Sequence, residues 1–246
     1  MVLKSVLPTT WDVPKAFRER LGDGVGKQRL MQAEGHLLLI LHRPPREDQT
    51  QRTGRYFWRK PDGSWQAFEP GGRSTTLAGH ISEFAEAVEK LDRLEEDAST
   101  AREYFAVISA LGPLHRAARN LHKVLQEARD AAPDDRELIN QRDRAYELER
   151  NTELLHTDAK NGLDFAVARQ AEAQAASSHR MAVSAHRLNL LAAFFFPLAT
   201  IAAVLGANVK HGWEDLPAPL PFFVMLAIGL ASGLMLTLFV TASRKS

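Results

Sequence analysis

The chain has 246 residues, of which 45% are hydrophobic and 25% charged, and its formal net charge is +1. A balance this close to neutral argues against nucleic acid as the main partner. There is no cysteine, which excludes disulfide bonds, thiolate metal sites and cysteine nucleophiles.

Residues 1–73 predict a small cytoplasmic α/β unit. Its Leu37–Leu41 segment is apolar at every position, as expected of a strand buried on both faces. Pro61-Asp62-Gly63 separates two short runs rich in aromatic residues, which indicates a hairpin. The other predicted elements are a strand at Val2–Leu7, a helix at Pro14–Leu21 and the hairpin strands Arg55–Lys60 and Ser64–Phe68. So few strands predict a reduced core that packs on something else.

Residues 74–132 predict a cytoplasmic pair of helices. Apolar residues recur there at spacings of three and four, and Gly112-Pro113 is expected to break or kink the second helix. The apolar stripe consists of Ile81, Phe84, Ala85, Val88, Leu91, Leu94, Ala98, Tyr104, Phe105, Ile108, Leu111, Leu114, Ala117, Ala118, Leu121, Val124 and Leu125.

Residues 133–187 predict a long stalk helix that continues into an apolar run, so that one helix extends from about Asp135 to Leu205. A lone helix of this length is unsupported in water, so packing on the preceding helices and on copies of itself, as in a coiled coil, is expected. Its narrow apolar seam consists of Leu138, Ala145, Leu148, Leu155, Ala159, Leu163 and Ala166.

Residues 188–243 predict two transmembrane helices joined by an outer loop at 206–219. The runs Leu188–Leu205 and Pro217–Ser243 carry no charge, and a bilayer core takes roughly 20 apolar residues of helix. Basic residues flank the pair on its terminal sides, whereas the single lysine of the loop is offset by two acids. This bias predicts a multi-pass protein of the cell (inner) membrane with both termini in the cytoplasm.

The segment Phe196–Asn208 reads Phe-Pro-Leu-Ala-Thr-Ile-Ala-Ala-Val-Leu-Gly-Ala-Asn. It resembles the CorA family of divalent-cation channels, whose first span contains a Pro-Leu-Thr-like segment and ends in Gly-Met-Asn. The predicted layout over residues 81–246 is similar to that family as well. The fold class that follows is an α+β membrane protein with a small N-terminal unit, a helical pair and a very long stalk helix entering the first of two spans.

The resemblance implies a homopentamer in a lipid membrane, with the first span lining a pore for Mg²⁺ or a related divalent cation. Gly206, Ala207 and Asn208 would form the selectivity filter. A ring of Asn208 amides would contact the metal through its hydration waters, because Mg²⁺ dehydrates reluctantly. Glu214 and Asp215 would attract cations to the outer entrance.

Helical spacing back from Asn208 predicts the pore-lining face, on which apolar side chains can gate by dewetting. Phe196 and Leu188 are the bulky gate candidates, and ordinary packing between spans is the alternative interpretation of this face. Thr200 stands one residue away from the pore threonine of the family. The predicted pore-lining residues are Leu188, Ala192, Phe196, Ala199, Thr200 and Ala203.

No catalytic motif is present in the sequence, so we expect a protein that is not an enzyme and that needs no cofactor besides its transported cation. Ala207 stands where the family has methionine, and related zinc-transporting members vary there too. Two alternatives to magnesium transport stay open: a non-conducting membrane-anchored scaffold or sensor, and a zinc, cobalt or nickel transporter on the same frame.

Overall fold

The computed structural model describes residues 6–22, 24–46, 52–207, 212 and 217–242, and it divides into two compact units, residues 1–168 and 169–246. Helix α4 (Arg136–Gly206) contributes residues to both units. The long helix expected from about Asp135 to Leu205 is therefore confirmed.

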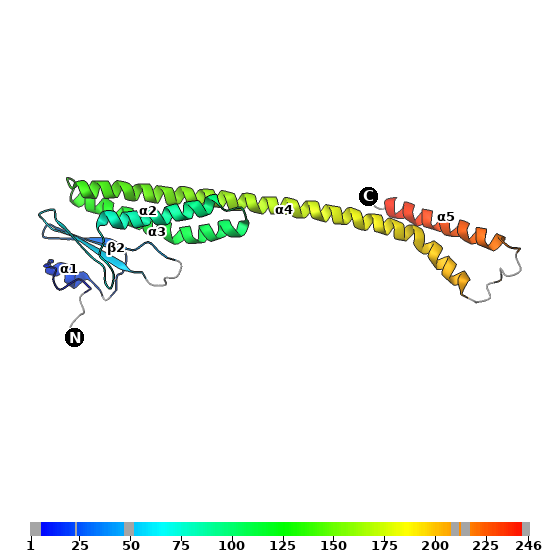
Figure 1. Ribbon diagram of the computed structural model, residues 1–246, viewed down its shortest axis with the longest axis horizontal. Helices are drawn as coiled ribbons and strands as arrows, with labels where there is room; N and C mark the ends of the chain where they lie inside the picture. The colour runs from blue at the N-terminus through cyan, green and yellow to red at the C-terminus, as the bar shows by residue number, and fades with distance from the viewer. Residues whose placement is uncertain (1–5, 23, 47–51, 208–211, 213–216, 243–246) are drawn as a thin grey trace. The chain divides into compact units, whose positions relative to one another are not determined.

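The N-terminal unit contains a four-stranded antiparallel sheet whose strands follow one another in chain order (Figure 1). Its elements are α1 (Lys15–Arg20), β1 (Arg29–Ala33), β2 (His36–His42), β3 (Gly54–Arg59) and β4 (Trp65–Phe68). The predicted helix, the buried strand and the hairpin are thus all present. The hairpin turns at Gly63, whose φ of 82° suits glycine best.

Two expectations for this unit differ from the structure. The expected strand at Val2–Leu7 lies largely outside the described residues, and Val6 and Leu7 form a bend rather than a strand. Strand β1 was not predicted, because its sequence Arg-Leu-Met-Gln-Ala lacks the β-branched and aromatic residues that favour strands. A tight turn with positive φ at Glu34 and Gly35 joins it to β2.

Strand β2 is buried on both faces, as its apolar sequence predicts. Leu37, Leu39 and Leu41 pack into a core shared with the helices that follow the sheet. Leu38 and Ile40 belong to a second core on the opposite face. The residues that complete this second core are Leu7, Trp11, Val13, Phe17, Met31, Tyr56 and Trp58.

Helices α2 (Leu77–Glu96) and α3 (Ala101–Ala131) cover one face of the sheet together with the first part of α4. Thr76 caps α2 by accepting a hydrogen bond from the amide of Gly79, and Thr100 forms a reciprocal capping box with Glu103. Of the break or kink expected at Gly112-Pro113, the break is wrong, because α3 continues through Pro113. Burial of Leu111 and Leu114 on either side of the proline supports the helix there.

Helix α4 begins against the sheet. Asp135 accepts a hydrogen bond from the amide of Leu138 at 3.1 Å, and its other carboxylate oxygen pairs with Arg59 of β3 at 2.5 Å. The first five residues of the predicted seam are buried, and the last two, Leu163 and Ala166, are partly buried.

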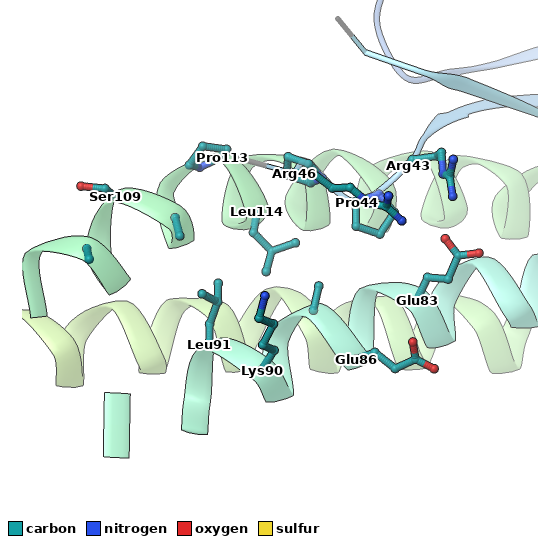
Figure 2. Close-up of a pocket in the computed structure, with 14 residues that line it drawn as sticks. Arg43, Pro44, Arg46, Glu83, Glu86, Lys90, Leu91, Ser109, Pro113 and Leu114 are labelled. Carbon is teal, nitrogen blue, oxygen red and sulfur yellow. The ribbon is translucent and has the colours of Figure 1, made fainter. Parts of the chain in front are cut away.

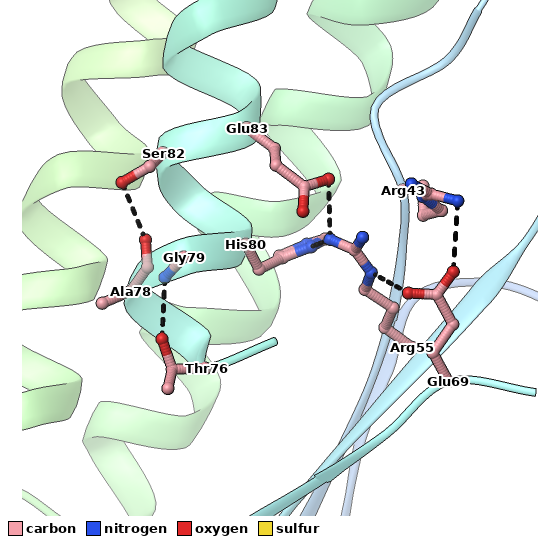
Figure 3. Close-up of polar contacts among 9 residues, drawn as sticks. All are labelled: Arg43, Arg55, Glu69, Thr76, Ala78, Gly79, His80, Ser82 and Glu83. Carbon is pink, nitrogen blue, oxygen red and sulfur yellow. Dashed lines mark hydrogen bonds and ion pairs between the residues drawn. The ribbon is translucent and has the colours of Figure 1, made fainter. Parts of the chain in front are cut away.

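A buried charge network joins β3 to α2 (Figure 3). The Arg55 guanidinium donates to Glu69 at 2.7 Å and forms an ion pair with Glu83 at 2.9 Å. It also lies 3.0 Å from Nδ1 of His80, a side chain with no exposed surface. Burial lowers the pKa of His80 to about 3, and the charge of Arg55 acts in the same direction. A neutral His80 accepts the Arg55 hydrogen at Nδ1.

The unfolding free energy should therefore depend on pH through His80. Its folded pKa lies below its unfolded value of 6.5, so below pH 6.5 the unfolded chain binds the extra proton and stability falls as the pH is lowered toward 3. The slope approaches about 1.4 kcal/mol per pH unit for one group. Thermal unfolding of the full chain in detergent between pH 7 and pH 5 measures it.

The variant His80→Gln should lose this part of the pH dependence, because glutamine can accept from Arg55 but does not titrate. His179→Gln, which changes an exposed histidine of α4, should keep it. Equal pH profiles for wild type and His80→Gln would contradict this account.

Candidate functional site

The C-terminal unit pairs the last part of α4 with α5 (Leu220–Ala242), and both helices are long and apolar enough to cross a membrane by length and composition. Their contact is close at two glycines of α5. A Cβ added at Gly229 would lie 3.2 Å from Cα of Leu198, and one added at Gly233 would overlap the carbonyl oxygen of Phe194. Small residues allow helix backbones to approach in this way within a bilayer.

The six predicted pore-lining residues lie on a different face of α4, and all six are exposed in the single chain. Leu188 and Phe196 are 67% and 71% exposed. At roughly 100° per residue, the six positions occupy an arc of about 120°, on the side opposite Phe194 and Leu198. Helix α5 of the same chain therefore does not cover the predicted stripe.

Thr200 lies on the border of this stripe next to Ala199. Its hydroxyl donates to the carbonyl oxygen of Phe196 at 2.8 Å, so its hydrogen is already used within the helix. Its oxygen keeps lone pairs that can accept hydrogen bonds from water.

The predicted filter begins where α4 ends. Gly206 is the last helical residue, and the amide of Ala207 still donates to the carbonyl oxygen of Ala203 at 3.0 Å. Asn208, Glu214 and Asp215 lie outside the described residues. Within the described part of the chain, no three His, Asp or Glu side chains gather closely enough to hold a metal ion.

The N-terminal unit contains two neighbouring cavities beside the segment that follows β2. The larger has a volume of about 1160 Å³ and lies between α2 and α3, with Arg43, Pro44 and Arg46 at its edge (Figure 2). Its wall mixes apolar side chains such as Leu91 and Leu114 with charged ones. The smaller cavity, of about 180 Å³, shares residues 43–46 and Pro113 with it.

Several of these features escaped the sequence analysis. Gly229 and Gly233 form a Gly-x-x-x-Gly pattern within an apolar helix, a signal of close helix packing that could have been used. The Arg55 network and the arginines of the smaller cavity are dispersed along the chain and carry no such signal.

The variant Gly233→Val should destabilise the C-terminal unit, because the added carbons overlap Phe194 and force α5 away from α4. Overpacking of this kind costs about 1–3 kcal/mol. The thermal midpoint of the detergent-solubilised chain reports the loss. Ala231→Val places the same valine side chain at an exposed position of α5 and should leave the midpoint unchanged, and an equal fall in both variants would disprove the close contact.

The chain is similar to several solved structures. The full-length CmaX structure is similar to the chain with a TM-score of 0.53 and 14% identity, covering 94% of this chain and 80% of CmaX. This likeness is one of fold. No curated protein matched the chain.

Two further solved structures are similar at lower scores. The ZntB cytoplasmic domain from Vibrio parahaemolyticus RIMD 2210633 has a TM-score of 0.47 and 13% identity, covering 65% of this chain and 80% of that one. The CorA magnesium transporter from Methanocaldococcus jannaschii has a TM-score of 0.41 and 14% identity, covering 88% and 79%.

A family described as "CorA-like Mg2+ transporter protein" matches residues 74–244, which include α2, α3, α4 and α5. Its members are ion transporters and not enzymes, which confirms the expectation that this chain is not an enzyme. With more than half of its length matched, the chain belongs to the CorA-like Mg²⁺ transporter family.

Proposed function

We propose that the chain forms a homopentameric channel that conducts Mg²⁺ or a related divalent cation inward across the cell (inner) membrane. Proteins of its family are oligomeric membrane transporters that handle divalent cations. The proposal adds the number of subunits, the ion, the direction of flux and the residues that line the path.

The observation that carries the proposal is the uncovered stripe on α4. A symmetric ring can turn the stripe of Leu188, Phe196 and Ala203 toward its axis, because α5 occupies the opposite side of α4. Helix α5 then faces lipid, which suits its exposed apolar side chains. Those side chains are Leu220, Phe222, Phe223, Ile228, Leu230, Leu234, Met235, Leu236, Leu238 and Phe239.

In this arrangement each span ends at Gly206 and Ala207, and the Asn208 side chains meet at the pore mouth. Their amide oxygens would accept hydrogen bonds from the water shell of the ion, which Mg²⁺ gives up reluctantly. Glu214 and Asp215 of every subunit would raise the cation concentration outside. With both termini in the cytoplasm, the membrane potential supplies about 4.6 kcal/mol for two charges per 100 mV.

Asn208→Ala should abolish selective Mg²⁺ flux while the oligomer stays intact, because the ring loses the oxygens that contact the hydrated ion. The measurement is dye-reported Mg²⁺ uptake into liposomes with a negative inside potential, with cobalt hexammine as a mimic of hydrated magnesium. Wild-type uptake should be blocked by the mimic. Asn161→Ala, an exposed change in the N-terminal unit, should conduct normally, and full uptake by Asn208→Ala would refute the filter assignment.

Phe196→Ala should raise basal flux several-fold, because removing a ring of phenyl groups widens the path and weakens dewetting at the gate. Phe195→Ala is the matched control. Phe195 is the same residue type, is also exposed at 54%, and lies roughly 100° around the helix from Phe196. Equal effects of the two substitutions would count against a pore-facing Phe196.

The family carries methionine where this chain has Ala207. Two alternative functions are therefore transport of another metal and a non-conducting scaffold or sensor. Faster uptake of Zn²⁺, Co²⁺ or Ni²⁺ than of Mg²⁺ in the same liposomes would show that the chain transports one of these metals instead. An inserted oligomer that passes none of these ions would instead be a membrane-anchored scaffold or sensor.

A further inference from the structure

The smaller cavity of the N-terminal unit lies where the ends of β2 and β3 meet α3. It encloses about 180 Å³, which on the scale of liquid water corresponds to roughly six molecules. Its wall consists of His42, Arg43, Pro44, Pro45, Arg46, Arg52, Thr53, Pro113, Arg116, Ala117 and Asn120.

Among the residues that the structure describes, four arginines and no acidic residue line this cavity. Arg43 is neutralised by Glu69 at 3.2 Å. For Arg46, Arg52 and Arg116, the described residues provide no ion-pair partner within 4 Å. These three arginines are exposed and line the same small cavity, so an anion bound there would offset their mutual repulsion.

The buried ring of His42 experiences the positive electrostatic potential of nearby arginines. Its Nε2 lies 3.0 Å from the carbonyl oxygen of Gly26. Burial lowers the pKa of His42, and the charges of Arg52 and Arg29 lower it further, against the raising effect of the Gly26 contact. The surroundings of this ring therefore oppose another positive charge.

The cavity is also anchored to the fold. The Gln28 amide donates to the carbonyl oxygen of Ala117 in α3 at 3.1 Å, and the Gln28 side-chain oxygen accepts from the amide of His42 at 3.4 Å. The amide of Arg43 donates to Thr53 at 3.1 Å, which holds the two strand ends together. The arginines thus extend from a wall whose backbone is fixed by hydrogen bonds.

We propose that this cavity binds a phosphoryl-bearing anion, a site that goes beyond ion transport and does not rest on the proposed channel. Guanidinium groups match the oxygens of a phosphoryl group in pairs, and Thr53 and Asn120 add neutral donors. The anion is either free phosphate or the phosphate end of a nucleotide. In the second case the nucleoside extends into the adjoining 1160 Å³ cavity, with which the site shares Arg43 and Arg46.

The test is isothermal titration of the full chain in detergent with inorganic phosphate and, separately, with magnesium-free ATP, at constant ionic strength set by chloride. Saturable binding of phosphate indicates the free ion, and binding of ATP alone indicates a nucleotide. Either result supports the site. Absence of binding with both probes overturns it.

The double variant Arg52→Gln/Arg116→Gln should bind the same probe at least tenfold more weakly. Arg119→Gln is the matched control, because Arg119 lies one turn further along α3 with its side chain 74% exposed and should not affect binding. Unchanged affinity in the double variant, or an equal loss in the control, would overturn the assignment.

Glu47 and Asp48 belong to the stretch between Arg46 and Arg52 that lies outside the described residues. Glu47→Gln/Asp48→Asn therefore tests internal neutralisation. Binding that appears only in this variant would mean that the arginines serve the chain's own acids, and the proposal would fail. Binding of comparable strength in wild type and in this variant supports an external anion.

Discussion

The close approach of α5 to α4 at Gly229 and Gly233 is the constraint on which the arrangement of the C-terminal unit depends. Lipid is as apolar as the side chains of a spanning helix, so burial of apolar surface does little to pair two spans and shape decides. The missing Cβ atoms allow contact with Phe194 and Leu198 on one side of α4. The opposite side, with Leu188 and Phe196, is left uncovered by α5.

The N-terminal unit is limited instead by its size, because four short strands cannot bury enough apolar surface alone. Strand β2 is therefore covered on both faces, by α1 and the N-terminal segment on one side and by α2, α3 and α4 on the other. The Arg55 network and the Arg59–Asp135 pair add polar contacts between sheet and helices. Helices that belong to the family's shared region thus complete the small core.

The two units carry different chemistry. The predicted stripe on α4 offers apolar side chains and the hydroxyl of Thr200. The N-terminal unit concentrates cationic side chains around a small cavity, although the chain as a whole is almost neutral. Overall charge therefore says little about a local site, because residues remote in sequence converge there.

Uncharged apolar runs along the sequence determined the two spans and the doubly buried strand, and apolar periodicity determined the buried seam of the long helix, since each pattern is a local property of consecutive residues. The sequence also placed Leu188 and Phe196 on one helical face, because a regular helix fixes angular positions. Only the tertiary structure decided that α5 packs on the Phe194 and Leu198 side of α4 and leaves this face open. It also decided that α3 passes through Pro113, that Arg-Leu-Met-Gln-Ala forms a strand, and that arginines from the segment between β2 and β3 and from α3 line one cavity. These outcomes depend on packing between segments distant in the chain, where contact energies outweigh local preference.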